Sequence, residues 1–345
     1  MPANPQEKLI RELSENTLGR RNVFEPEEYR KGKSALREPA DVAWSCSDAV
    51  VLMYLKAGHK GWKRDAERNL RQAEGWLTEW RRGRPLQGGT LEGPLSVTYK
   101  PSQAVMVLSV SSDQALTKIV RHDDVAARLD IDACATVSQG FLQAVADECV
   151  GVADLAIMLR EWPKAFSTTD IEFFHAYCLS SIARAAERAG WRPTGPPNEH
   201  LRHVASIIGN FRSVVVTRKP GTEDTTSAFE PNEFFSAFTL AEQWQLLYTF
   251  GHAVELVREG MPFMQLEAQI DTYRVVVQVA ERASGWTGGV LGLMAPPDCD
   301  LILNYVLGLD MMQFAPSRTL SVRTPTIAWR VMRDLAGRRP EPAEP

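Results

Sequence analysis

The sequence lacks the features that would cross-link the chain or embed it in a membrane. Its 345 residues include five cysteines, and no two of them form a C-x-x-C pair, so neither a zinc site nor a redox dithiol is indicated. No apolar run reaches the length of a membrane-spanning helix, and the segment from Met1 to Asn16 lacks the apolar core of a secretory signal. We therefore expect a cytoplasmic protein without membrane contact, whose cysteines are buried and reduced.

Charge of one sign is also lacking. The chain has 39 Lys and Arg residues against 43 Asp and Glu residues, which gives a formal net charge of −4. Proteins that bind nucleic acids usually carry a strong basic field, so no nucleic-acid partner is expected. Apolar residues make up 44% and charged residues 24% of the chain, an ordinary globular composition that argues against disorder and fibrous repeats.

Local catalytic motifs are missing as well. The sequence contains no Walker P-loop, no G-x-G-x-x-G fingerprint, no G-x-S-x-G elbow and no H-E-x-x-H zinc helix. The enzymes that this leaves are those that assemble single residues from distant parts of the chain. We therefore expect a non-enzymatic protein, with no catalytic residues, no cofactor and no metal, that acts by binding.

What the sequence does contain is apolar spacing that we interpret as helical. Between Trp62 and Trp80, apolar residues recur at intervals of three and four with Arg and Glu between them, as in an amphipathic helix. The denser segment 41–57, which ends before Gly58, is interpreted as a buried helix. The two segments together predict an antiparallel helical hairpin.

The same interpretation extends along the rest of the chain. Glycine- and proline-rich turns separate further segments with helical spacing. These segments are 103–110, 113–122, 133–162, 169–189, 198–208, 239–258, 264–283, 298–309 and 325–335. One short strand is suggested at 214–216. The predicted fold class is all-α, made of consecutive antiparallel helical hairpins that form a bundle or a solenoid.

This organisation predicts four parts. Residues 1–34 form an amino-terminal arm, residues 35–195 a first half of helical hairpins, and residues 196–336 a second helical half packed on the first. The tail 337–345 is rich in Pro and Glu and is expected to be disordered.

Two long loops are the predicted edges of a binding surface. They cover residues 81–99 and 211–231, and loops of this length in compact proteins often serve a function. The first loop begins with the basic run Arg81-Arg82-Gly83-Arg84, which we interpret as a solvated segment.

A helical-bundle metalloenzyme is the alternative hypothesis. Glu172 and His175 have the spacing of a carboxylate and an imidazole in the di-metal sites of helix bundles, and His252 with Glu255 repeats these residue types in reverse order. However, Glu172 also completes a capping box that begins at Thr169, which explains its carboxylate without a metal. The preferred interpretation therefore has no metal at these residues.

Three other groups of residues have simple structural explanations. His200 and His203, one helical turn apart, are typical surface residues, and the nine tryptophans favour core packing. An acidic cluster resembles a Mg²⁺-diphosphate site, but its spacing favours a solvated turn. The cluster consists of His122, Asp123, Asp124, Asp130 and Asp132.

A family resemblance rests on the amino-terminal third. Trp44 through Tyr54, Gly58, Trp62 and Ala73, followed by Gln103 to Ser109 and Ser112-Asp113, carry the pattern. This pattern resembles bacterial immunity proteins of the immunity protein 49 type. The resemblance implies an all-helical fold and a protein that binds and neutralises a cognate toxin without catalysis.

No functional residue follows from the resemblance. The function that we predict is that of a helical, non-enzymatic protein whose partner is another protein, with a bacterial toxin as the candidate that the resemblance suggests. Its oligomeric state is left open.

Overall fold

The structure is a computed structural model in which the chain forms two compact units. The first comprises Met1–Ala176 with Pro325–Pro345, and the second comprises Tyr177–Thr324. The structure describes residues 5–18, 22–30, 36–46, 49–56, 61–90, 93–147, 151–161, 177–178, 180–181, 239–245, 249, 252, 256 and 259–261, and the backbone of the strands between 263 and 316.

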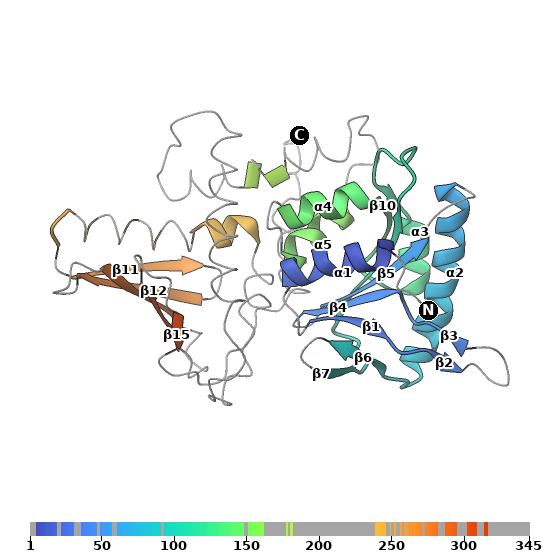
Figure 1. Cartoon of the computed structure of the whole chain (residues 1–345), viewed down its shortest axis with the longest axis horizontal. Helices are drawn as coiled ribbons and strands as arrows, with labels where there is room; N and C mark the ends of the chain where they lie inside the picture. Colours follow the sequence, from blue (N-terminus) through green and yellow to red (C-terminus); the bar gives the residue numbers. More distant parts are fainter. Residues whose placement is uncertain are drawn as a thin grey trace, which may run out of the picture. The chain divides into compact units, whose positions relative to one another are not determined.

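The first unit is built on an eight-stranded mixed sheet (Figure 1), whose strands lie in the order β7-β6-β1-β4-β5-β8-β10-β9. The strands β5, β8 and β10 are parallel neighbours, and the other pairs are antiparallel. The strands are β1 (Val23–Pro26), β4 (Val42–Cys46), β5 (Ala49–Lys56), β6 (Leu86–Thr90), β7 (Gly93–Val97), β8 (Ala104–Ser111), β9 (Val120–Arg121) and β10 (Ala133–Ser138). A separate two-stranded ribbon consists of β2 (Tyr29–Arg30) and β3 (Leu36–Arg37).

Helices cover both faces of this sheet. Helices α2 (Trp62–Arg81) and α3 (Asp123–Leu129) contact one face, and α1 (Pro5–Leu18), α4 (Gln139–Asp147) and α5 (Val152–Glu161) contact the other (Figure 1). Strand β8 is accordingly buried along its whole length. A central strand covered on both faces carries apolar side chains at nearly every position, rather than at every second one.

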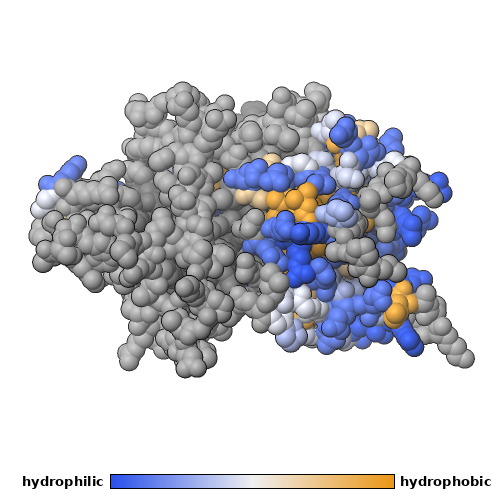
Figure 2. Space-filling model, in the orientation of Figure 1, coloured by the Kyte–Doolittle hydropathy of each residue, from blue (hydrophilic) through white to orange (hydrophobic). Residues whose placement is uncertain are grey.

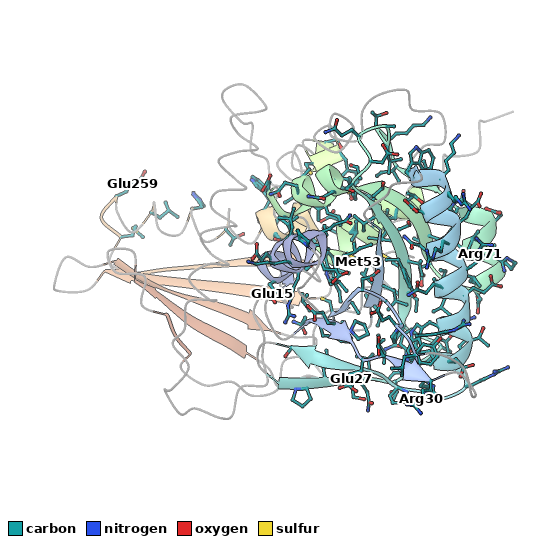
Figure 3. The ribbon with its side chains drawn as sticks, turned by 45° about the vertical axis from the view of Figure 1, so that its right-hand side comes forward. Glu15, Glu27, Arg30, Met53, Arg71 and Glu259 are labelled. Atoms are coloured by element: carbon teal, nitrogen blue, oxygen red, sulfur yellow. The ribbon has the colours of Figure 1, made fainter. Side chains whose placement is uncertain are left out.

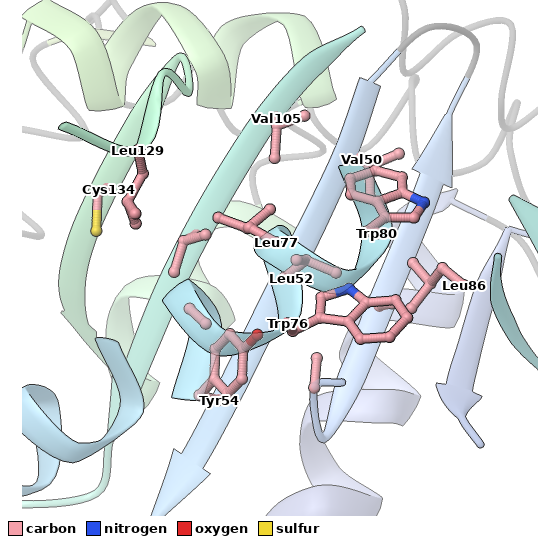
Figure 4. Close-up of a cluster of buried hydrophobic side chains, with 14 of the residues drawn as sticks. Val50, Leu52, Tyr54, Trp76, Leu77, Trp80, Leu86, Val105, Leu129 and Cys134 are labelled. Atoms are coloured by element: carbon pink, nitrogen blue, oxygen red, sulfur yellow. The ribbon is translucent and has the colours of Figure 1, made fainter. Parts of the chain in front are cut away.

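The core under α2 shows why this helix forms where it does. Its buried residues recur every three or four positions and include Trp76, Leu77 and Trp80. These side chains pack on alternate residues of β5, among them Val50 and Leu52 (Figure 4). Helical spacing on one side and strand spacing on the other therefore meet in one apolar layer.

The second unit contains a five-stranded antiparallel meander in the order β11-β12-β13-β14-β15. Each strand pairs with the next one along the chain. The strands are β11 (Phe263–Ile270), β12 (Tyr273–Glu281), β13 (Thr287–Met294), β14 (Ile302–Gly308) and β15 (Phe314–Pro316).

The prediction of an all-α fold is therefore wrong. The segment 41–57, predicted as one buried helix, forms the antiparallel strands β4 and β5, and 103–110 forms most of the parallel strand β8. A dense apolar run has the same composition in a buried helix and in a strand covered on both faces, so density alone does not separate them. The larger part of 264–283 is strand as well, in β11 and β12.

Some of the other predicted helices are confirmed and others are wrong. The helix from Trp62 to Trp80 is confirmed as α2, and the block 133–162 holds α4 and α5 but begins with strand β10. In 113–122 the structure has turns and strand β9, and 298–309 contains strand β14.

The remaining predicted segments are described in part or not at all. Residues 240–245 are helical, as predicted for 239–258, and the described residues of 169–189 are helical too. The segments 198–208, 211–231 and 325–335 and the tail 337–345 lie outside the described residues, and so does the suggested strand at 214–216. Helix α1 and strands β1 and β2 lie within the predicted arm 1–34. No helix in the described part of the chain is long and apolar enough to span a membrane.

Candidate protein-binding surface

The residues of the metal hypothesis are mostly outside the described part of the chain. Glu172, His175 and Glu255 are among those residues, as are His200 and His203 of the second histidine pair. His252 is described as an exposed helical residue. Within the described ranges, no group of three or more His, Cys, Asp or Glu residues is placed to hold a metal ion.

The acidic cluster near α3 holds the local structure together. Asp123 Oδ1 accepts a hydrogen bond from Arg121 Nε at 2.8 Å, and Asp132 Oδ2 accepts one from the backbone N–H of Val105 at 2.8 Å. Asp130 ends α3 in the left-handed region, with φ of 49°. These partners account for the carboxylates of Asp123 and Asp132. The predicted solvated turn between helices is instead the short helix α3 between strands β9 and β10, which begins after His122 and ends at Asp130.

His122 begins α3 and is joined to the sheet. Its Nε2 lies 2.8 Å from Thr136 Oγ1 on β10. Burial lowers the pKa of His122, and the charges of Asp124 and Asp123 act in the opposite direction. The neighbouring thiol of Cys134 has its pKa raised to about 12, mainly by burial, so at neutral pH it is a protonated core residue and no nucleophile.

The carboxyl ends of the parallel strands are where open α/β sheets usually bind ligands. Here side chains of the chain itself fill that position. Asp113 Oδ2 accepts a hydrogen bond from the N–H of Trp62, the first residue of α2, at 3.1 Å. About two turns along α2, Asn69 Nδ2 donates to Ser109 Oγ at 2.9 Å and to the Tyr54 carbonyl at 3.2 Å. The donor groups at the start of α2, which attract anions in such sites, are thus partly used internally.

The β2–β3 ribbon is the most distinctive exposed feature of the described surface. Tyr29 pairs with Arg37 and Arg30 pairs with Leu36, and paired residues of antiparallel strands lie on the same face. The ribbon therefore has an inner face with Tyr29 and an outer face with Arg30 and Leu36. Leu36 is 51% exposed, although it is a large apolar residue.

Tyr29 anchors the ribbon to the body of the first unit. It is 7% exposed, and its ring centroid lies 5.0 Å from that of Trp76 in α2, at an interplanar angle of 57°. The guanidinium carbon of Arg84 lies 5.3 Å from the centre of the Tyr29 ring. Burial raises the pKa of Tyr29, while the positive charges of Arg37 and Arg84 lower it. The inner face is thus fixed, and the outer face is free for contacts.

Within residues 30–37 every charged residue is basic, and the exposed Glu28 and Glu38 lie on either side of the ribbon. Residues 30–37 read Arg-Lys-Gly-Lys-Ser-Ala-Leu-Arg, with four cationic side chains and no acidic one. In Figure 2 the end of the first unit that bears the ribbon shows a small apolar spot among hydrophilic residues, and Figure 3 marks Arg30 at that end. An exposed apolar side chain inside a basic segment is the combination from which protein interfaces are built.

The sequence interpretation missed this surface. A cluster of four basic residues in eight positions was available as a signal, but nothing local shows that Tyr29 is buried and turns Leu36 outward. Most of the predicted loop 81–99 forms the hairpin β6–β7, and Arg84, near its start, contacts Tyr29 of the ribbon.

Comparison with known proteins gives no relative. The sequence matches no protein-family model and no curated protein, and the structure matches no solved structure. The function is therefore argued from the surface itself.

Proposed function

We propose that this protein acts by binding another protein, with the outer face of the β2–β3 ribbon at the centre of the contact and an acidic surface on the partner. The observation that carries this proposal is Leu36, which is 51% exposed within a segment of four cations and no anion. The apolar side chain contributes binding free energy, and the positive charges of the segment favour a partner surface that is negatively charged.

The size of the apolar contribution is modest but measurable. Complete burial of a leucine side chain contributes about 1.5–3 kcal/mol. Since about half of Leu36 is already covered, burial of the rest contributes on the order of 1 kcal/mol. The exposed Arg30 and Arg37 add electrostatic attraction, which acts mainly on the rate of association.

A protein partner is favoured over a nucleic acid. The chain as a whole has a net charge of −4, which opposes binding to a polyanion outside the ribbon. The exposed Leu36 offers nothing to a phosphate backbone, whereas it fits an apolar pocket on a protein.

A bacterial toxin in the cytoplasm is the first partner to test, because the resemblance to immunity proteins suggests one. The helical fold that this resemblance implies does not hold for most of the residues that carry it, although Trp62 and Ala73 lie in helix α2. Trp44 and Tyr54 lie on β4 and β5, and Ala104 to Ser109 lie on β8. The toxin hypothesis therefore rests on the binding surface and on its own experiment, not on a shared fold.

Site-specific photo-crosslinking in the native host tests the proposal. A photoreactive amino acid replaces Leu36 in the full chain, and a matched variant carries it at Glu12 on α1, whose side chain is 59% exposed. We expect a discrete protein product from position 36 and none from position 12. The product counts as support only when the purified pair binds and Leu36→Ser weakens binding about tenfold, since about 1.4 kcal/mol corresponds to that factor.

Met261→Ser is the matched control, because Met261 is similarly exposed, at 48%. This variant is expected to bind like the original chain. The absence of a product at position 36, equal losses for both substitutions, or recovery of nucleic acid as the bound species would each contradict the proposal. If the partner is a toxin encoded by the adjacent gene, co-expression of this protein is expected to rescue the growth of cells that produce the toxin. The Leu36→Ser variant is expected to rescue growth less well.

A further inference from the structure

The carboxyl end of α2 holds two arginines in fixed backbone positions next to the ribbon. The N–H of Gly83 donates to the Trp80 carbonyl at 3.0 Å, and that of Arg84 donates to the Glu79 carbonyl at 3.2 Å. Gly83 has φ of 94°. This is the Schellman arrangement of a helix end, in which a glycine in the left-handed region closes the last turn. Arg82 and Arg84, on either side of that glycine, thus leave the helix from a defined position.

The three consecutive arginines of this region have different roles. Arg81 points toward the end of α3, where Nη2 donates to the carbonyls of Leu129 and of Asp130, the latter at 2.9 Å. Its guanidinium also lies 5.4 Å from the Tyr99 ring centre. Arg82 and Arg84 remain on the surface, with side chains 70% and 42% exposed. Of these three arginines, Arg81 is the one that donates hydrogen bonds to the end of α3, which Arg128 also joins to α2 through Glu74.

In the described part of the chain, Arg82 and Arg84 both lie against the carboxylate of Glu79. Arg82 Nη1 lies 3.4 Å from Glu79 Oε1, and Arg84 Nε lies 3.8 Å from Glu79 Oε2. Charge-assisted hydrogen bonds of this kind are usually about 2.7–2.9 Å long, so both contacts are loose. The Glu79 side chain is only 13% exposed, whereas those of Arg82 and Arg84 extend into solvent.

We propose that Arg82 and Arg84 form a carboxylate-binding site that receives an Asp or Glu side chain of the partner at the flank of the ribbon. This inference rests on the proposed function and specifies its chemistry. Glu79 neutralises one of the two positive charges and aligns both guanidiniums, and the second charge is free for an external carboxylate. The planar fork of arginine matches the two oxygens of a carboxylate, which a lysine ammonium does not.

The proposed site is joined to the ribbon by one contact. Arg84 touches Tyr29, and Tyr29 is the neighbour of Arg30 in β2. Arg84 therefore lies at the inner face of the ribbon, and a partner that covers Leu36 on the outer face has to extend past the edge of the ribbon to reach Arg82 and Arg84. The negative end of the α2 dipole also favours cations at this end of the helix. That effect requires only a positive charge, so it does not account for the exposed N–H groups of Arg82.

Binding of a short poly-glutamate peptide to the purified full chain tests the inference independently of any partner. Affinity is measured by fluorescence anisotropy at low salt and at about 150 mM salt, where screening separates close contacts from distant attraction. We expect Arg82→Gln with Arg84→Gln to weaken binding about tenfold, on the scale of charge-assisted contacts worth about 1.5–3 kcal/mol. Arg71→Gln is the matched control, because Arg71 is an exposed arginine of the same helix that lies away from Arg30 (Figure 3).

The outcomes separate this site from the proposed function. Leu36→Ser is expected to leave peptide binding unchanged, since the peptide has no apolar group to contact it. Equal weakening by the Arg71 control, or no weakening by the double variant, would overturn the carboxylate site even if the Leu36 crosslink is found. Tighter binding of a short oligo(dT) than of poly-glutamate would overturn it as well. A thermal unfolding curve for each variant shows whether the fold is intact, and Arg82→Gln alone, at the more exposed position, is measured if the double variant unfolds.

Discussion

The carbonyl oxygen of Glu25 in β1 lies against the backbone of Gly88 in β6. A Cβ atom on Gly88 would stand 2.3 Å from that oxygen and 2.6 Å from Cδ2 of Phe24. The two strands are joined at this point, where Pro26 pairs with Gly88 and Glu25 with Gly89. Because the closest obstacle is backbone, it moves only if the strands separate, so a glycine is required at position 88.

Gly88→Ala is expected to destabilise the first unit strongly. We expect a loss of about 3 kcal/mol in the free energy of unfolding, at the upper end of the usual cost of overpacking. Denaturant unfolding followed by tryptophan fluorescence measures it. Gly89→Ala is the control, because nothing lies within 4 Å of a Cβ at that position, and a loss above about 1 kcal/mol there would show that the strand rejects any side chain.

Gly75 lies inside α2 and has no structural need for glycine. No atom lies within 4 Å of a Cβ placed there, so Gly75→Ala is expected to stabilise the protein by about 0.5–1 kcal/mol through helix propensity. Gly83→Ala, at the end of the same helix, is expected to cost about 1–2 kcal/mol because of its φ of 94°. A higher unfolding midpoint for Gly75→Ala and a lower one for Gly83→Ala would confirm both predictions. Shifts in the same direction would contradict the assigned helix end.

Asp113 links the loop after β8 to the start of α2. Its Oδ2 accepts from the Trp62 N–H at 3.1 Å, and its Oδ1 accepts from the Ala115 N–H at 2.9 Å. Since Gly61, the residue before α2, makes no side-chain cap, Asp113 takes the place of a capping residue. Asp113→Ala is expected to cost about 1 kcal/mol in unfolding free energy. The exposed Ser112 is the control, and a Ser112→Ala variant with the same loss would point to the loop rather than the cap.

Helix α2 could be predicted because its buried face is periodic. Ala66, Leu70, Ala73, Leu77 and Trp80 fall on one side of a helix, with charged residues between them. No such contrast exists in β5 or β8, where covering helices on both sides remove the polar positions that would reveal a period of two. Burial on both faces thus erases the pattern on which the distinction between helix and strand depends.

Strand β11 is different, since its pattern was present in the sequence. Met264, Leu266, Ala268 and Ile270 alternate with polar residues, and this is the period of a strand with one polar face. The helical interpretation of 264–283 overlooked it. The candidate surface could be predicted only in part, because the basic cluster at 30–37 is local, whereas the contact of Tyr29 with Trp76 and Arg84 joins residues far apart in the chain.

Protonation of His122 provides a prediction on pH. Burial lowers the pKa of His122 in the folded protein below the ordinary value of a histidine side chain, about 6.5, so the unfolded chain binds the proton more readily than the folded one. The stability that depends on neutral His122 is therefore complete above about pH 6.5 and is lost as the pH falls through the lowered pKa of the folded state.

His122→Gln keeps a polar side chain beside Thr136 but cannot titrate in this range. We expect the drop in melting temperature between about pH 7.5 and about pH 5.5 to be smaller in this variant than in the original chain. Carboxylates titrate in both proteins, so only the difference between the two drops reports on His122, and an equal drop would show that its protonation is not coupled to folding.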